Sequence, residues 1–199
     1  MTDKRFSPLP VTLLEAGASF HRAQSQYPSN VTLDSPAQDV MTDLKKVRAI
    51  TVEPTFSISA ANMKMIHAGV RLLLVTNGVG TIIGLITATD ILGEKPMQYM
   101  INAGGLYEDI QVQHIMTPRE ALEVLQMTDV AKAQVGNIVE TLKRCGRQHA
   151  LVVDADKKTN KTCVRGIFSS TQIGRQMGVK LDVYEVVHSF AELGQVLSR

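Results

Sequence analysis

The chain has 199 residues, of which 44% are hydrophobic, so it is long enough for one domain or two small fused ones and too apolar to be disordered. Tryptophan is absent and aromatic residues make up 5%, which predicts an aliphatic core of sheet and helix and argues against an aromatic platform for single-stranded nucleic acid. The formal net charge of +2 argues against a dedicated duplex-DNA binder.

The cysteine pattern and the hydropathy bear on the compartment. Cys145 and Cys163 lie among apolar residues outside any metal-ligand spacing, so we expect buried, reduced thiols. The first residues are not followed by the apolar core of a signal peptide, and no apolar run is long enough to span a membrane. These features predict a cytoplasmic protein that has no membrane partner.

The first patterned half of the chain begins after a mostly polar stretch that carries one apolar patch at 11–14. The expected order is an extended stretch, a helix, two strands and a second helix, at 49–52, 57–68, 72–75, 81–86 and from 89 onward. Gly69 is placed to end the first helix. Asn77-Gly78 predicts a type I′ hairpin turn, and Thr89 or Asp90 is the expected N-cap of the second helix.

The second half follows the same order. A helix, two strands and a short helix are expected at 131–145, 149–153, 162–168 and up to 177. Between the halves, 95–109 is expected to be a linker with a short helix broken at Gly104-Gly105. After them, apolar residues at helical spacing predict an amphipathic helix over 183–197.

Three sequence anchors recur in the same order and show an internal repeat. V-M-T at 40–42 returns as I-M-T at 115–117, and L-L-L-V at 72–75 returns as A-L-V-V at 150–153. The third anchor, G-L-I-T-A-T-D-I at 84–91, returns at 166–173, so the offset between the copies drifts only slightly along the chain. We therefore divide the chain into an N-terminal extension, a first repeat, a linker, a second repeat and a C-terminal helix, at 1–35, 36–94, 95–109, 110–178 and 179–199.

The order V-M-T, helix, apolar strand, hairpin and G-h-h-T-x-x-D, where h is apolar, resembles the CBS domain over residues 36–178. The resemblance implies a mixed α/β (α+β) fold in which two β-α-β-β-α units, related by a pseudo-twofold axis, pack sheet to sheet. It also implies a regulatory module that binds AMP, ADP, ATP or, as a weaker candidate, S-adenosylmethionine in clefts between the repeats. The nucleotide would be a regulatory ligand for energy sensing, no cofactor would be required, and the chain would form a homodimer that signals to a regulated protein the sequence does not identify.

The resemblance assigns a main cleft to residues of both repeats: Arg71, Leu85, Thr87, Asp90, Ala121, Leu122 and Val124. A ribose cis-diol is best held by a carboxylate, which favours Asp90 as its anchor, with Thr87 on the same turn for a ribose or phosphate oxygen. Arg71 would contact phosphate, and the segment after the second I-M-T would form the adenine slot. The alternatives are a plain helix cap for Asp90, a solvated strand-end charge for Arg71 and ordinary core residues for the slot.

A second, weaker cleft is expected from Val47, Ala49, His149, Ile167, Ser169 and Gln172. Here Gln172 replaces the aspartate, and losing a charge-assisted hydrogen bond costs roughly 1–2 kcal/mol, or about tenfold in affinity. We therefore expect one competent site, at Asp90. His149 is either a phosphate contact when protonated or an ordinary strand-end histidine.

No catalytic motif is present in the sequence, and the histidines have no metal-ligand spacing, so we expect neither an enzyme nor a metal site. The main alternative to a nucleotide sensor is a protein–protein interaction or scaffold module with vestigial clefts, which Gln172 favours. A nucleic-acid-associated module that uses Lys45, Lys46 and Arg48 is the third hypothesis, and the near-neutral charge argues against it. We interpret these three residues as solvated loop charge.

Overall fold

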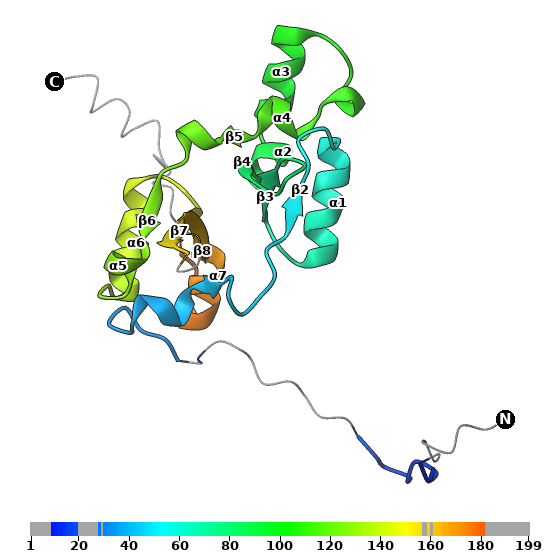
Figure 1. Ribbon diagram of the computed structural model, residues 1–199, viewed down its shortest axis with the longest axis vertical. Helices are drawn as coiled ribbons and strands as arrows, with labels where there is room; N and C mark the ends of the chain where they lie inside the picture. The colour runs from blue at the N-terminus through cyan, green and yellow to red at the C-terminus, as the bar shows by residue number, and fades with distance from the viewer. Residues whose placement is uncertain (1–8, 20–27, 29, 157–158, 160, 182–199) are drawn as a thin grey trace, which may run out of the picture.

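The structure is a computed structural model, and it describes residues 9–19, 28, 30–156, 159 and 161–181. Two four-stranded mixed sheets face each other, and each is covered by helices on its outer face, so the molecule has two lobes (Figure 1). This arrangement agrees with the mixed α+β fold of two packed units that the sequence predicts. None of the helices in the described part is long and apolar enough to cross a membrane.

The first sheet has the strand order β2-β3-β4-β5, in which β2 runs parallel to β3 and the other pairs are antiparallel. Its strands are β2 (Thr51–Val52), β3 (Leu72–Thr76), β4 (Ile82–Thr87) and β5 (Thr117–Pro118). The helices of this lobe are α1 (Ile58–Ala68), α2 (Ala88–Leu92), α3 (Lys95–Ala103), α4 (Val112–Ile115) and the 3-10 turn η2 (Tyr107–Asp109).

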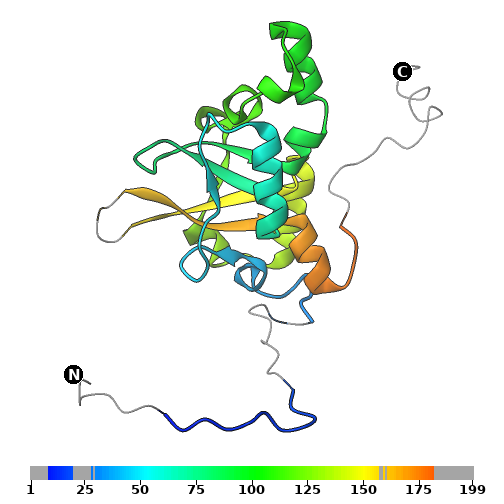
Figure 2. The same ribbon diagram turned by 90° about the vertical axis from the view of Figure 1, so that its right-hand side faces the viewer.

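The second sheet repeats this pattern with the order β6-β7-β8-β1, again with one parallel pair, β6 with β7. Its strands are β1 (Thr42–Asp43), β6 (Val124–Gln126), β7 (His149–Ala155) and β8 (Thr162–Ser169). Its helices are η1 (Ala37–Val40), α5 (Met127–Val130), α6 (Val135–Arg144) and α7 (Ser170–Met177), and the 3-10 turn η3 (Arg119–Ala121) connects β5 to β6 and contacts β4. The β3–β4 and β7–β8 hairpins project from the same side of the molecule, away from the helices (Figure 2).

The central strands are buried on both faces, which explains their unbroken apolar sequence. Leu73, Val75 and Ile86 pack against the helices of the first lobe, whereas Leu74 and Leu85 alternate with them and face the other sheet. Leu151 of β7 meets these last two from the opposite side, so a third, smaller core holds the two sheets together.

The two repeats exchange their V-M-T segments. Strand β1, from the first repeat, pairs with β8 through Thr42 and Ile167, and β5, from the second repeat, pairs with β4 through Thr117 and Leu85. Each sheet is therefore completed by the motif of the other repeat, and neither repeat is structurally complete alone.

The exchange explains why V-M-T and the glycine of G-h-h-T occur together. The methionine of each V-M-T lies on the glycine of the other repeat: a Cβ atom built on Gly84 would lie 2.8 Å from Met116 Sδ and 2.8 Å from the Thr117 carbonyl oxygen. At Gly166 the added Cβ would collide with the Met41 side chain. Because the glycine has no side chain, the exchanged segment can pack closely against the strand at this position.

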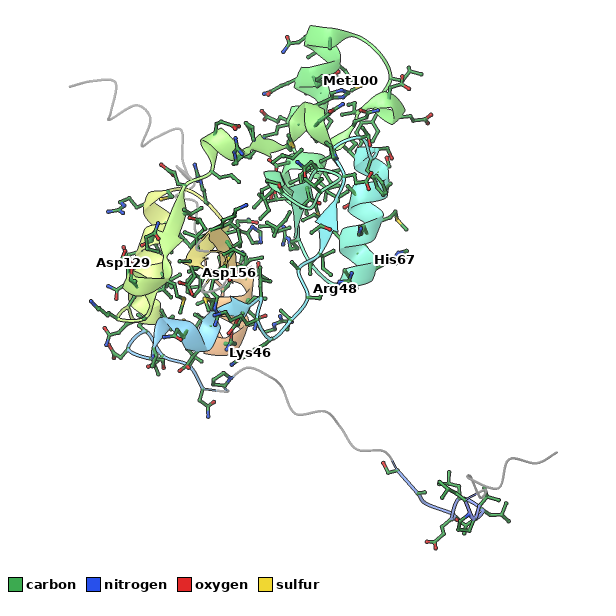
Figure 3. The ribbon with its side chains drawn as sticks, in the orientation of Figure 1. Lys46, Arg48, His67, Met100, Asp129 and Asp156 are labelled. Atoms are coloured by element: carbon green, nitrogen blue, oxygen red, sulfur yellow. The ribbon has the colours of Figure 1, made fainter. Side chains whose placement is uncertain are left out.

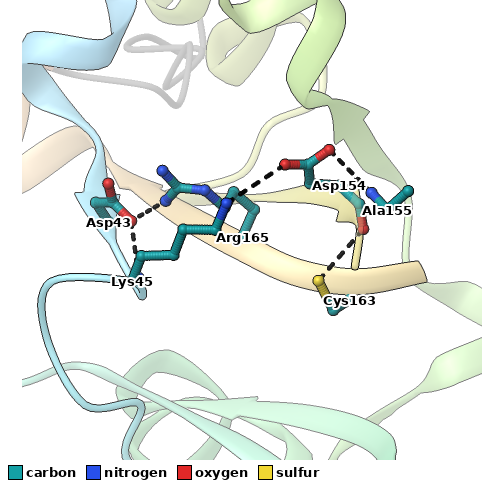
Figure 4. Close-up of polar contacts among 6 residues, drawn as sticks. All are labelled: Asp43, Lys45, Asp154, Ala155, Cys163 and Arg165. Carbon is teal, nitrogen blue, oxygen red and sulfur yellow. Dashed lines mark hydrogen bonds and ion pairs between the residues drawn. The ribbon is translucent and has the colours of Figure 1, made fainter. Parts of the chain in front are cut away.

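A partly buried ion pair fastens β1 to β8 (Figure 4). The Arg165 guanidinium donates to Asp43 Oδ1, and the two side chains are only 14% and 13% exposed. The same oxygen accepts the backbone N–H of Lys45 at 2.8 Å, and Lys45 Nζ lies 4.0 Å from Asp154 Oδ2. Lys46 and Arg48 follow on the segment that crosses to the other lobe (Figure 3).

The first helix covers the predicted range and ends at the predicted glycine. Ser57 Oγ accepts a hydrogen bond from Ala60 N at 3.2 Å, and Gly69 ends the helix in the left-handed region with φ of 64°. Helix α3 likewise stops at Gly104, as expected for the linker. The proposed helix at 183–197 lies outside the described residues.

Three local expectations were wrong. The β3–β4 connection is not a type I′ turn at Asn77-Gly78, because Asn77 Oδ1 accepts Val79 N and Thr81 N and the left-handed residue is Gly80. The long helix of the second repeat begins at Val135 rather than at 131, since α5 and a turn precede it. Both cysteines are exposed, and the Cys163 thiol donates to the Asp154 carbonyl oxygen at 3.3 Å.

Candidate functional site

A cavity of about 210 Å³ opens beside the start of α2, where the two lobes meet. This volume is several times the roughly 30 Å³ share of one water molecule, so it admits part of a small organic ligand. Its lining comes from both repeats: Leu85, Thr87, Thr89, Asp90, Thr117, Leu122, Glu123, Gly146, Arg147, Gln148, His149 and Leu151. Four residues of the predicted main cleft, Leu85, Thr87, Asp90 and Leu122, are among them.

The acidic wall of the cavity is a capping box at the start of α2. Thr87, not Thr89 or Asp90, is the N-cap, and its hydroxyl accepts Asp90 N at 3.2 Å. In return, Asp90 Oδ2 accepts Thr87 N at 2.8 Å and Thr87 Oγ1 at 2.7 Å. The sequence T-A-T-D therefore fixes the carboxylate locally, and Asp90 is a capping residue as well as a cavity residue.

The other carboxylate oxygen of Asp90 is held by a cation. Lys95 Nζ lies 2.6 Å from Asp90 Oδ1 and also donates to the Ile115 carbonyl oxygen at 3.2 Å. The Asp90 side chain is 13% exposed, so the pair is largely shielded from solvent on the carboxylate side. The sequence analysis did not single out Lys95, although its place just past the short α2 was a signal that it could return to the carboxylate.

The opposite wall is the beginning of β7. His149 lies opposite Ser169 in the β7–β8 register, as Leu72 lies opposite Thr87 in the first sheet. Leu72 faces the other sheet, so the equivalent His149 side chain faces the space between the sheets and lines the cavity. Burial first, and the positive charge of Arg71 second, lower the pKa of the His149 imidazole to about 4, against the opposing effect of Asp90. The ring is therefore neutral at pH 7.

Not all predicted site residues come together. Arg71, Ala121 and Val124 do not line the Asp90 cavity, although Arg71 is close enough to act electrostatically on His149. Val124 and Ala49 line a neighbouring cavity of about 810 Å³ between the two hairpins, which shares Leu122 and Leu151 with the Asp90 cavity and joins residues predicted for different clefts. Val47, Ile167, Ser169 and Gln172 are not part of the Asp90 cavity, whereas His149, predicted for the second cleft, is.

Several lining residues were missed. Thr117 belongs to the repeated I-M-T motif, and its pairing with Leu85 brings its side chain to the cavity, so the motif itself was a signal. Arg147 and Gln148 precede β7, as Arg71 precedes β3, but the sequence comparison aligned His149 with Arg71 and passed over them. Arg147 forms an exposed ion pair with Glu123 at 3.1 Å, so this edge of the cavity carries both charges.

Gln172 occupies the position in the second repeat that corresponds to Asp90. Its amide is engaged along α7: Arg175 donates to the Gln172 Oε1 atom, and Gln172 Nε2 donates to Gln176 Oε1 at 3.0 Å. Gln176 Nε2 continues this chain to the Asp39 carbonyl oxygen at 3.0 Å. The side chain therefore makes helix and η1 contacts, unlike Asp90, which closes a capping box beside a cavity.

Comparison with known proteins gives a family match for the first repeat and a similar fold for most of the chain. Residues 37–96 match the CBS domain family. A solved structure of an uncharacterized conserved protein from Pyrococcus horikoshii is similar to this chain at 22% identity and a TM-score of 0.54, over 76% of this chain and 98% of that one. A CBS-domain containing protein from Agrobacterium tumefaciens is similar at 16% identity and a TM-score of 0.52, over 78% and 98%.

The fold is therefore that of a paired CBS-domain protein. This confirms the resemblance of the sequence to a tandem CBS-domain chain, with the family match covering the first repeat and the fold covering both. CBSX2 of Arabidopsis thaliana, solved in complex with AMP, is similar at 21% identity and a TM-score of 0.48, over 71% of this chain and 94% of that one. No curated protein matches the chain.

Proposed function

We propose that this chain is a regulatory module that binds one adenine nucleotide in the Asp90 cavity and signals its occupancy to a partner protein. The observation that carries the proposal is the composition of the cavity, which joins a fixed carboxylate, several hydroxyls and apolar side chains from both repeats. AMP, ADP and ATP are the favoured ligands, with S-adenosylmethionine as a weaker candidate, and the protein would act in the cytoplasm as a homodimer.

Each part of a nucleotide has a chemical partner at the cavity. Asp90 Oδ2 is occupied by the two Thr87 donors, whereas Oδ1 meets one cation and keeps a lone pair for a ribose hydroxyl. Leu85, Leu122 and Leu151 offer an apolar slot for the base. Since His149 is neutral at pH 7, the charge of the phosphate would be met by Arg147 at the edge of the cavity, with Arg71 acting from outside the lining, rather than by an imidazolium.

One site per chain follows from the asymmetry between the repeats. Asp90 presents a carboxylate to its cavity, whereas the amide of Gln172 is hydrogen-bonded to Arg175 and Gln176. A ligand in the second cleft would lose the charge-assisted bond to ribose and would have to break these contacts. We expect the second cleft to bind at least tenfold more weakly, since a lost interaction of about 1.4 kcal/mol already gives a factor of ten.

Exposed apolar side chains support a protein partner or a second copy of the chain. Met63 and Ile66 on α1 are 50% and 62% exposed, and Met97 and Ile101 on α3 are 57% and 75% exposed. Large apolar groups on two helices of one lobe are typical of an interaction surface. The same observation supports the alternative function, a scaffold whose clefts no longer bind a ligand.

Calorimetry separates the sensor from the scaffold. AMP, ADP, ATP and S-adenosylmethionine are titrated in turn into the wild-type chain, Asp90→Ala and Gln172→Ala. We expect about one nucleotide per chain for the wild type and for Gln172→Ala, and a loss of at least tenfold in affinity for Asp90→Ala. Gln172→Ala is the matched control because it removes a side chain of similar size from the equivalent position.

Two results would contradict the proposal. If no ligand gives heat or raises the unfolding temperature of the wild type, the scaffold is the better account. If Gln172→Ala weakens binding as much as Asp90→Ala does, the ligand is not located by the Asp90 cavity.

A further inference from the structure

The turn after α2 returns the chain to Asp90. Gly93 ends α2, and its N–H donates to the Thr89 carbonyl oxygen at 2.9 Å. A Cβ atom at Gly93 would lie 2.6 Å from the same oxygen, so only glycine fits this close approach. Helix α3 then begins at Lys95, and the tight turn brings the ammonium group of Lys95 back to the Asp90 carboxylate.

Lys95 contacts the carboxylate from outside the cavity. Asp90 lines the cavity, but Lys95 is not among the described residues that do so. The ammonium group therefore holds the carboxylate from a position beside the described lining. With Thr87 on Oδ2 and Lys95 on Oδ1, three donors fix the orientation of the carboxylate, and the remaining lone pair of Oδ1 is available to a hydroxyl.

The same ammonium group also contacts the segment that the second repeat contributes to the first lobe. Its second hydrogen bond goes to the Ile115 carbonyl oxygen, at the end of α4. Shortly after Ile115, Thr117 pairs with Leu85 in the sheet and lines the cavity. Lys95 thus connects the carboxylate contributed by the first repeat to the I-M-T segment contributed by the second.

We infer that Lys95 is a positioning residue that orients Asp90 for a ribose hydroxyl and ties both the carboxylate and the I-M-T segment to the start of α3. The inference rests on the proposed function, because it needs Asp90 to be the ribose anchor. It goes further by assigning ribose recognition to a pair of residues, and by making α3, which carries the exposed Met97 and Ile101, the element that senses an occupied carboxylate.

The test compares two ligands that differ only at the ribose. AMP and 2′,3′-dideoxyadenosine 5′-monophosphate are titrated into the wild-type chain, Lys95→Met, Lys95→Arg and Lys143→Met. Lys143→Met is the matched control, since Lys143 also pairs with a carboxylate, Glu140 at 3.4 Å, but on α6 and away from the cavity. Lys95→Met keeps the length of the side chain and removes only the charge and its donors.

We expect Lys95→Met to weaken AMP binding about tenfold, the effect of one lost charge-assisted interaction, and to leave the binding of the dideoxy ligand unchanged. Lys95→Arg should recover most of the AMP affinity, and Lys143→Met should behave as wild type. In an Asp90→Asn background, Lys95→Met should have no further effect, because the two residues act through one contact.

The two proposals fail in different ways. Equal weakening of both ligands by Lys95→Met, or no weakening of either, overturns the inference while leaving nucleotide binding in place. A wild-type chain that binds AMP no better than the dideoxy ligand overturns Asp90 as the ribose anchor and the inference with it. A wild-type chain that binds neither ligand overturns the proposed function itself.

Discussion

The contact between Gly84 and the exchanged segment gives a sharp prediction for Gly84→Ala. The new Cβ would lie 2.8 Å from both Met116 Sδ and the Thr117 carbonyl oxygen, about 0.7 Å inside the usual optimum of roughly 3.5 Å. Met116 can rotate, but the Thr117 oxygen belongs to the backbone of β5 and moves only if that strand shifts away from β4. We expect a loss of about 1–3 kcal/mol in the free energy of unfolding, the usual cost of overpacking.

Urea unfolding followed by circular dichroism measures this loss as a lower midpoint with an unchanged slope. For a domain of this size, the thermal midpoint should fall by about 2–4 °C for each kcal/mol. Gly78→Ala is the control, because its Cβ would meet nothing within 4 Å and its φ is not in the left-handed region. Adding Met116→Ala should restore only part of the stability, since the Thr117 oxygen remains. Equal midpoints for Gly84→Ala and Gly78→Ala would refute the argument.

Two further predictions concern charge. Burial lowers the pKa of His149 to about 4 in the folded chain, whereas the imidazole of the unfolded chain takes up a proton near pH 6.5. The unfolded chain therefore binds more protons between pH 6.5 and 4, so the free energy of unfolding is at its full value above pH 6.5 and falls as the pH falls toward 4. Between pH 7 and 4, the free energy of unfolding measured in urea should fall by at most about 3 kcal/mol more for the wild type than for His149→Gln. The same pH dependence in both proteins would contradict this. Separately, Asp43→Ala or Arg165→Ala should each cost about 3 kcal/mol by stranding a partly buried charge. The double variant should cost less than the sum of the two, and strict additivity would contradict the pairing.

Much of the fold could be predicted from local signals. The apolar spacing of 57–68 and the glycine that follows it define α1, and the run at 72–75 is one buried strand. The repeated motifs identified two copies of one unit. The type I′ turn failed because Asn77 uses its own side chain to accept two backbone N–H groups, which makes a longer turn that closes at Gly80.

The site was harder to predict because one residue of register decides which face of a strand a side chain occupies. Matching by apolar similarity aligned L-L-L-V at 72–75 with A-L-V-V at 150–153. The hydrogen-bond register instead makes Leu74 equivalent to Leu151, since these lie opposite Leu85 and Ile167. His149 then corresponds to Leu72 and points between the sheets, which places it in the Asp90 cavity. The sequence comparison had instead aligned it with the charged residue Arg71 at the end of a strand.

The exchange of strands also explains why the cavity could not be assembled from one repeat. Thr87 and Asp90 come from the first repeat, whereas Thr117 reaches the same cavity only because β5 crosses to β4. A ligand that contacts both walls therefore bridges the two repeats, and it can bias their relative position only to the extent that it binds one arrangement better than another. The Lys95 ammonium already joins the Asp90 carboxylate to the exchanged segment without a ligand, so the energetic coupling between the nucleotide, this segment and α3 should depend on this contact more than on the total area of the cavity.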